Sequence, residues 1–218
     1  MNHKMQNKMR ILFEVFLSYI LFGVLGFISR IFPIVFVLFV LYGILFPLYW
    51  GKKNNELNTY GYTWKNFFKS VFIGFAVGVF WCLYTFLLFN NTDTFAQLWM
   101  VQVLIGFFVW FLFLSPFQEF YFRGFFQSRL RKVFGGNFAI LITSIAFLIW
   151  HFFPNLSDSN TSSLPLDSVK GILSIFFSST LFGYSFEKSG NILAPWLAHA
   201  IGGLGLVIIG HMSFIIYS

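Results

Sequence analysis

Residues 115–124 read SPFQEFYFRG and lie inside a long stretch that is otherwise almost entirely apolar. The segment places Gln118, Glu119 and Arg123 where lipid or a protein core would surround them. Ionisable side chains at membrane depth are costly and rare, and each is a functional-site candidate by default. Glu119 and Arg123 are spaced i,i+4 with the acid first, the favourable order for an ion pair on one helix face. The segment therefore predicts either a buried structural ion pair or part of a functional site.

The composition around this segment is typical of a membrane protein. The chain has 218 residues, of which 58% are hydrophobic and only 10% are charged, against roughly 25% charged residues in a soluble domain. Backbone groups in lipid must be satisfied within helices, so we expect an all-α polytopic membrane helix bundle, one integral domain over residues 1–218. The net charge of +7 is explained by Lys and Arg at helix ends that meet lipid head groups. The bilayer is therefore an expected partner and nucleic acid is not.

The apolar runs predict about seven transmembrane helices, with eight as an alternative, because runs near 20 residues can cross the hydrocarbon core. The expected spans are residues 11–28, 31–50, 67–89, 95–115, 138–153, 169–186 and 192–216. The fourth is expected to continue past Pro116 to about Leu130 as a kinked helix. Neighbouring helices can compensate there for the backbone hydrogen bond that proline removes.

The distribution of basic residues predicts the orientation of the chain. Lys and Arg are concentrated in the N-terminal tail, the 51–69 loop, the 129–137 turn and the 187–191 turn. Seven spans place all four segments on one side of the membrane. The positive-inside rule then predicts that the N-terminus is cytoplasmic and the C-terminus lies outside.

Two histidines lie in other predicted spans, His151 in FLIWHFFPN and His199 in LAPWLAHAIGG. Each alone is more often a satisfied core residue. Their depth in the membrane can be estimated, however, from the cytoplasmic end of each helix at a rise of 1.5 Å per residue. Glu119 then lies about 15 Å deep, His151 about 21 Å and His199 about 12 Å. A carboxylate and two imidazoles near one depth can take a proton from water and donate to an oxyanion, which is the chemistry of peptide-bond hydrolysis.

The same three side chains could instead hold zinc as a two-histidine, one-glutamate site. The chain has no H-E-x-x-H motif, so the spacing gives a metal little support. We therefore expect no cofactor and no metal, with Glu119, His151 and His199 as the ligands if a divalent ion such as zinc is present.

Three segments of the chain resemble, in order and spacing, the three motifs of the CAAX-protease and bacteriocin-processing family, also called the abortive-infection family. These segments are QEFYFRG, FLIWH and APWLAHAIGG. The family pattern is E-E-x-x-x-R-G, F-x-x-x-H and H-x-x-x-N, and the resemblance covers about residues 95–205. It implies an intramembrane endopeptidase similar to type II CAAX prenyl endopeptidases, located in a bacterial cytoplasmic membrane. The implied substrate is a membrane-associated protein or peptide, in CAAX-type processing, bacteriocin maturation or self-immunity.

The resemblance also implies a role for each motif position. By position, Gln118 and His151 take the water-activating role. His199 and Gly203 take the oxyanion-stabilising role, and Glu119 and Arg123 take the supporting role. Two positions depart from the family pattern. Gln118 replaces the water-activating glutamate, and a carboxamide cannot accept a proton near neutral pH. Gly203 replaces the asparagine, so one oxyanion donor is missing.

These departures leave two main hypotheses. In the first, the chain is an endopeptidase in which Glu119 or His151 activates water and His199 stabilises the oxyanion. In the second, it is a catalytically inactive relative that acts as a membrane scaffold or a partner-binding regulator. A transporter or proton relay would also use buried acid and histidine residues, but the sequence shows no internal repeat of the kind that many transporters have.

Overall fold

The computed structural model describes residues 3–89, 99–152, 169–210 and 212, and this part of the chain is helical, as predicted. Three long helices come first: α1 (His3–Ile31), α2 (Pro33–Lys53) and α3 (Phe67–Phe89). A composite helix follows, and then α7 (Gly136–Phe152), α8 (Val169–Ser189) and α9 (Leu193–Ile208). The predicted fourth span starts in residues 95–98, and these lie outside the described residues.

The composite helix runs from Trp99 to Phe134 over 36 residues. It consists of α4 (Trp99–Val109), the π-helical stretch η1 (Trp110–Leu114), α5 (Ser115–Glu119), the π-helical stretch η2 (Phe120–Gln127) and α6 (Ser128–Phe134). The predicted continuation past Pro116 is confirmed, and the helix ends at Phe134 rather than near Leu130. Gly135 follows with φ +83°, a conformation that glycine adopts without strain at a helix end. π-Helical turns are rare and often mark functional sites.

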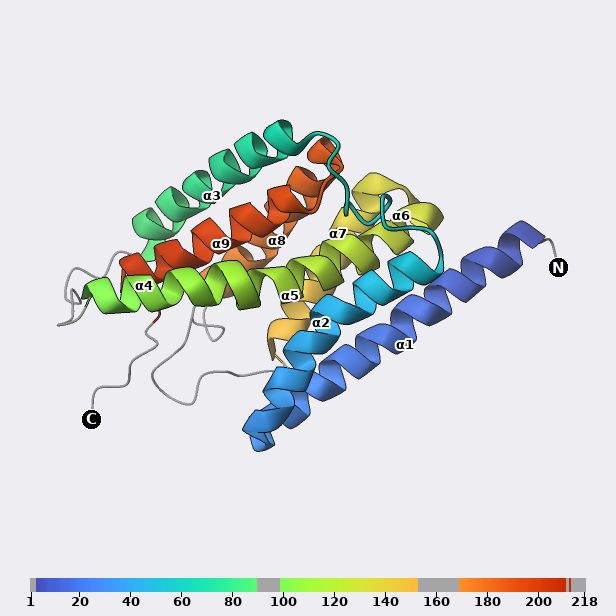
Figure 1. Ribbon diagram of the computed structural model, residues 1–218, viewed down its shortest axis with the longest axis horizontal. Helices are drawn as coiled ribbons and strands as arrows, with labels where there is room; N and C mark the ends of the chain where they lie inside the picture. Colours follow the sequence, from blue (N-terminus) through green and yellow to red (C-terminus); the bar gives the residue numbers. More distant parts are fainter. Residues whose placement is uncertain (1–2, 90–98, 153–168, 211, 213–218) are drawn as a thin grey trace.

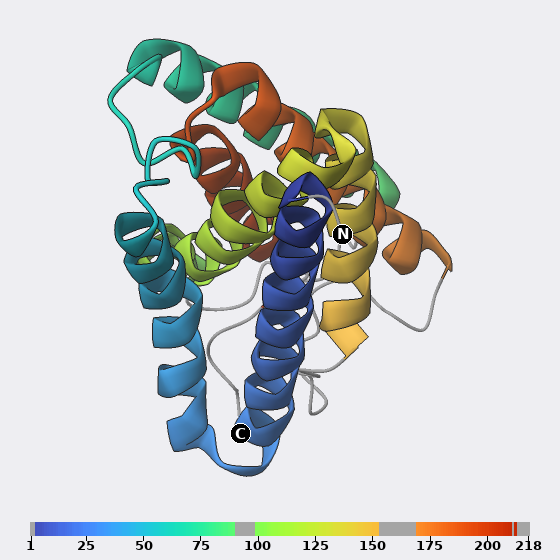
Figure 2. The same cartoon turned by 90° about the vertical axis from the view of Figure 1, so that its right-hand side faces the viewer.

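The composite helix lies centrally between two groups of helices (Figure 1). The α1–α2 hairpin packs on one side, where α2 contacts α5 and η2. On the other side α9 contacts α4, η1 and α5, and α3 and α8 pack against α9. In the view of Figure 2 the α1–α2 hairpin stands apart from α3 and α9, with the composite helix between them. The first and third predicted motifs are therefore carried by helices in direct contact.

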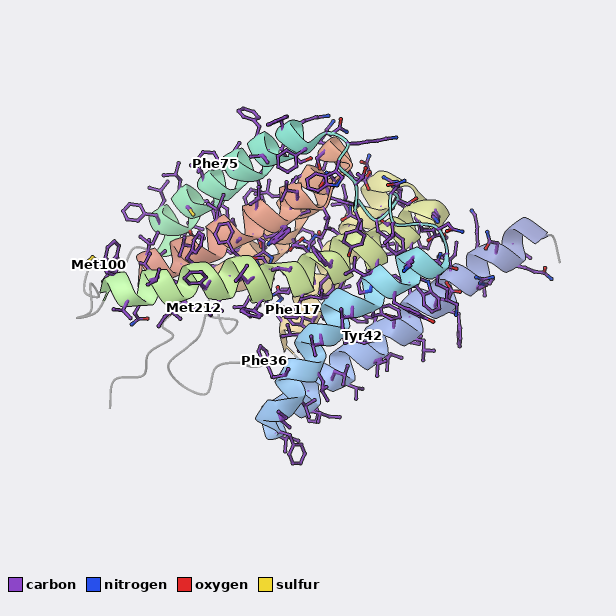
Figure 3. The ribbon with its side chains drawn as sticks, in the orientation of Figure 1. Phe36, Tyr42, Phe75, Met100, Phe117 and Met212 are labelled. Carbon is purple, nitrogen blue, oxygen red and sulfur yellow. The ribbon has the colours of Figure 1, made fainter. Side chains whose placement is uncertain are left out.

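An aromatic core joins the hairpin to the composite helix. The rings of Phe22 and Tyr121 stack with centroids 3.9 Å apart and planes at 4°, and Phe117 packs against Phe22. The Ser18 hydroxyl lies 3.1 Å from the hydroxyls of both Tyr42 and Tyr121, so it bridges the two helices. Tyr42 and Phe117 lie near this contact in Figure 3. The core fixes the rotation of η2, and with it the direction in which Arg123 points.

The outer surface of the bundle is strongly apolar, as a lipid-facing surface must be. Phe72 is 74% exposed and Leu87 is 78% exposed, and Figure 3 shows Phe75 and Met100 on the outside. In the described part of the chain, five helices are long and apolar enough to cross a membrane: α1, α2, α3, the composite helix and α8. The apolar helices Gly136–His151 and Leu193–Ile208 are shorter. The chain is an integral membrane protein.

One end of the bundle is polar and carries the predicted basic segments. Arg129 of α6 pairs with Glu14 of α1 and, at 3.0 Å, with Glu56 of the loop after α2. Arg131 pairs with Glu187 near the end of α8 at 3.2 Å. These contacts gather the start of α1, the 51–69 loop, the 129–137 turn and the end of α8, as the charge pattern predicted. Which face of the membrane this end occupies stays a prediction.

Asn191 fixes the start of α9 to the loop between α2 and α3. Its side-chain amide donates to the carbonyls of Thr63 at 2.6 Å and Lys65 at 3.0 Å. Its Oδ1 accepts from the backbone N–H of Leu193 at 2.9 Å, which satisfies a donor at the helix N-terminus. These contacts therefore fix the position of α9, which carries His199, along its own helix axis.

The predicted extension of the last span to residue 216 is wrong at residues 209 and 210, because α9 ends at Ile208. Gly210 adopts φ +76°, and Met212 N–H donates to the Leu206 carbonyl at 3.2 Å. This is the pattern of a glycine-capped helix C-terminus. Residues 213–216 lie outside the described residues.

Candidate functional site

Glu119 and Arg123 form an ion pair in the middle of the bundle, and both side chains are fully buried. Arg123 Nη1 donates to Glu119 Oε1 at 3.3 Å. Arg123 Nε lies 3.2 Å from Glu119 Oε2, although this N–H is not aligned for a hydrogen bond. Arg123 Nη2 also donates to the carbonyl and hydroxyl oxygens of Ser179 on α8 at 2.8 and 2.7 Å. The predicted pair therefore ties the composite helix to α8.

The acid of this pair also orients His199 on α9. His199 Nδ1 lies 2.6 Å from Glu119 Oε1. With a carboxylate as acceptor, Nδ1 carries the proton, which leaves Nε2 for other contacts. The imidazole stacks on the ring of Phe182, with centroids 4.9 Å apart and planes at 24°. Glu119 thus acts on His199 as the carboxylate acts in a catalytic triad, by fixing the tautomer and the orientation of the ring.

His151 lies near the end of α7 and has a defined tautomer as well. Its Nδ1 lies 2.8 Å from the carbonyl oxygen of Phe147. A carbonyl can only accept, so Nδ1 is the donor and Nε2 of the neutral ring is an unprotonated acceptor. The ring packs against Phe147 and Trp150, with centroids 4.5 and 4.6 Å away. This arrangement leaves one unprotonated nitrogen, Nε2, in an otherwise aromatic environment.

A cavity of about 50 Å³ brings the two histidines together. Its walls are mostly aromatic and aliphatic and include polar groups from several helices. The lining residues are Trp81, Trp110, Phe147, His151, Ile175, Ser178, Phe182, His199, Gly203 and Leu206. A cavity of this size with polar walls has room for water. The second and third predicted motifs thus meet at one water-sized space, with the ion pair directly behind His199.

Gln118, like Glu119 and Arg123, does not line this cavity. Its side chain is 6% exposed. Its Oε1 is buried without a hydrogen-bond partner in the described part of the chain. An unpaired buried acceptor of this kind costs about 1–3 kcal/mol. The position where the resemblance places the water-activating glutamate therefore holds a side chain that is not on the cavity wall.

Gly203 lies on the cavity wall, but the space beside it is taken by Trp110. A Cβ atom built on Gly203 would overlap the six-membered ring of this indole. Trp110 is 6% exposed and belongs to the π-helical stretch η1. An aromatic ring therefore occupies the place that the resemblance assigns to an asparagine side chain, and the glycine is needed for that packing.

Sequence reasoning missed Trp110 and Ser179 as site residues. A tryptophan in an apolar run is indistinguishable from a core residue, so Trp110 could be found only through Gly203. Ser179 left a clearer signal, because the run Ser178-Ser179-Thr180 interrupts an apolar helix. Hydroxyl side chains inside a membrane bundle commonly bond across helices.

In the part of the chain that the structure describes, no three His, Cys, Asp or Glu side chains are placed to hold a metal ion. Glu119 Oε1 and His199 Nδ1 instead form a hydrogen bond with each other, at 2.6 Å. The alternative zinc set of Glu119, His151 and His199 therefore does not fit this arrangement. A reaction without metal or cofactor stays a prediction.

Two histidines line one cavity among apolar helices, and a buried glutamate–arginine pair contacts one of them. These features define an intramembrane protease-like protein. Residues 99–204 match the family described as Rce1-like, type II CAAX prenyl endopeptidase Rce1-like. This match confirms, over residues 99–204, the resemblance to the CAAX-protease family that the three motifs predicted. No curated protein and no solved structure matches the chain.

Proposed function

We propose that the chain is an intramembrane endopeptidase that hydrolyses a peptide bond of a membrane-associated protein or peptide. The observation that carries this proposal is the cavity on which His151 and His199 meet. CAAX-type processing, bacteriocin maturation and self-immunity are the classes of reaction that the family supports. No metal or cofactor is needed for the steps below.

In the proposed reaction His151 is the general base. A water molecule in the cavity gives a proton to His151 Nε2 while its oxygen attacks the substrate carbonyl carbon, and the carbonyl π electrons move to oxygen. His199 stabilises this oxyanion as an imidazolium: its Nε2–H donates to the oxyanion while its Nδ1–H donates to Glu119, whose carboxylate balances the charge of the ring. Collapse of the intermediate re-forms the C=O bond and breaks the C–N bond, and the leaving nitrogen takes the proton from His151. The products are a carboxylic acid and an amine.

The geometry favours His151 over Glu119 as the base. Glu119 is fully buried, and its Oε1 already accepts from both Arg123 and His199. His151 has an unprotonated ring nitrogen, Nε2, and lines the cavity. Glu119 and Arg123 are therefore assigned a positioning role, through His199.

We further propose seven membrane crossings, with the N-terminus in the cytoplasm of a bacterial cell and the C-terminus outside. The polar end formed by α6, the 51–69 loop and the end of α8 supports this orientation. It would face the cytoplasm under the positive-inside rule.

Substitution of His151 tests the proposed reaction. His151→Ala is expected to reduce kcat by at least about 100-fold, the usual contribution of a general base. His151→Gln should lose as much, because an amide can still hydrogen bond but cannot accept the proton. Turnover is measured with purified protein in liposomes that contain a panel of lipid-anchored fluorogenic peptides. Equal cleavage by wild type and both variants would refute His151 as the base.

A second candidate is an inactive scaffold that binds a membrane-associated partner. It is favoured by two specific observations: Gln118 lies off the cavity wall, and Trp110 fills the space beside Gly203. On this reading the buried ion pair is kept for helix packing. A pull-down that captures the same partner with wild type and with the His151→Ala, His199→Ala double variant would support it. Robust turnover by the purified wild type would rule it out.

Gln118→Glu distinguishes the two candidates in a single assay. If His151 is the base, the new carboxyl is off the cavity and kcat should stay within about threefold of wild type, a change below 1 kcal/mol. If the site is intact except for its base, Gln118→Glu should create turnover that the wild type lacks, and Glu119→Gln should not. The same peptide panel provides the measurement.

A further inference from the structure

The indole N–H of Trp110 is a buried hydrogen-bond donor that has no acceptor in the described part of the structure. Its side chain is 6% exposed, and its Nε1 has no hydrogen-bond partner among the described residues. Buried polar groups are nearly always paired, so an orphan calls for an explanation such as catalysis or a bound molecule. The ring lines the same cavity as His151 and His199.

The position of Trp110 is set by two features. It is the first residue of the π-helical stretch η1, where an extra residue per turn changes the direction of the side chains. The absence of a side chain at Gly203 lets the indole lie directly on α9. Its ring centroid is 5.5 Å from that of His199. A donor and an imidazole from two different helices therefore share one wall of the cavity.

We propose that the Trp110 indole N–H donates a hydrogen bond to the carbonyl oxygen of a bound substrate, as the second oxyanion donor beside His199. This inference rests on the proposed endopeptidase function. An indole N–H is a donor only, so it suits an oxygen that gains negative charge and cannot act as a base. The N–H bond stays intact through the reaction, and the bonds that break and form are those of the hydrolysis described above.

Other indoles in the chain show what is particular to Trp110. Trp196 Nε1 donates to the Phe111 carbonyl at 2.9 Å, so that indole is satisfied. Trp50 and Trp150 also have buried Nε1 atoms without a partner in the described residues. Neither of them lines the cavity. Among these four tryptophans, only Trp110 both has an unpaired N–H and lines the cavity that His151 and His199 also line.

The test compares two substitutions at position 110 with a matched control. Trp110→Phe removes the N–H and part of the ring. Site-specific 3-benzothienylalanine keeps the bicyclic shape and replaces only the N–H by sulfur. Both are expected to lower kcat by about 100-fold, as loss of one oxyanion donor does, with KM changed by less than about threefold. The control Trp50→Phe also removes an unpaired indole N–H, at a residue that does not line the cavity, and should keep wild-type kcat.

A binding measurement separates transition-state stabilisation from packing. A phosphinate analogue of a cleaved peptide mimics the tetrahedral intermediate, and the benzothienylalanine variant should bind it about 100-fold more weakly while binding of the parent peptide is unchanged. Wild-type kcat in this variant would overturn the role of Trp110 and leave the proposed function standing if His151→Ala is inactive. Absence of turnover in wild-type protein would overturn the proposed function, and the donor role with it.

Discussion

Arg123→Met is expected to lower the free energy of unfolding by about 3–5 kcal/mol, since removing one partner of a buried ion pair leaves the other charge uncompensated. Arg123 is fully buried and binds Glu119 as well as two oxygen atoms of Ser179. Methionine retains the volume of the stem without any donor. The variant should therefore lose both the ion pair and the link from η2 to α8, and the unfolding midpoint in detergent micelles measures the effect.

The double variant Glu119→Gln, Arg123→Met is the control for this interpretation. It removes both charges, so it should be more stable than Arg123→Met alone, as is found when buried pairs are replaced together. His199 would then lack its carboxylate, and turnover should stay low in both variants. An Arg123→Met protein within 1 kcal/mol of wild type would show that the pair contributes no more than an exposed one.

Gly203→Asn is expected to destabilise the protein by about 3 kcal/mol, at the upper end of the usual cost of overpacking a core. The new side chain would need the volume that the Trp110 ring occupies. The substitution restores the asparagine that the resemblance implies at this position. We nevertheless expect it to lower turnover, because it would displace the indole from the cavity wall. Unfolding in micelles and cleavage of the peptide panel are measured on the same preparation.

A double-mutant cycle with Trp110→Ala tests whether the two positions compete for one space. Trp110→Ala alone should cost about 3–5 kcal/mol through the cavity that it leaves. In the Trp110→Ala, Gly203→Asn double variant the asparagine gains room, so the loss should be smaller than the sum of the single losses. Strictly additive losses would mean that the residues do not interact.

Much of this architecture could be predicted because hydropathy and charge act over whole segments. The composite helix past Pro116, the i,i+4 ion pair and the basic end of the bundle all follow from local spacing. The depth estimate correctly placed Glu119 near His199, which lie on separate helices 80 residues apart in sequence. Helix rise and the position of the polar ends are sufficient for that estimate.

The features that could not be predicted depend on rotation and on shape. Gln118 is next to Glu119 in sequence, but the two π-helical stretches that flank α5 change the angular relation between successive side chains. No sequence pattern marks those stretches, so the position of Gln118 relative to the cavity could not be foreseen. The overlap of Trp110 with the space beside Gly203 is a matter of shape between two helices, and hydropathy does not report shape. The end of α9 at Ile208 could have been suspected from Gly210.

The length of the composite helix has a consequence for the way the protein sits in its membrane. Its 36 residues would extend about 54 Å as an α-helix, whereas the hydrocarbon layer is about 30 Å thick. The helix must therefore cross the bilayer obliquely, project beyond it, or deform the lipid around it. If the helix crosses obliquely, a thicker or thinner bilayer would change its tilt, and Trp110, Glu119 and Arg123 all lie on this helix. We therefore expect lipid chain length to influence the geometry of the cavity wall that Trp110 forms.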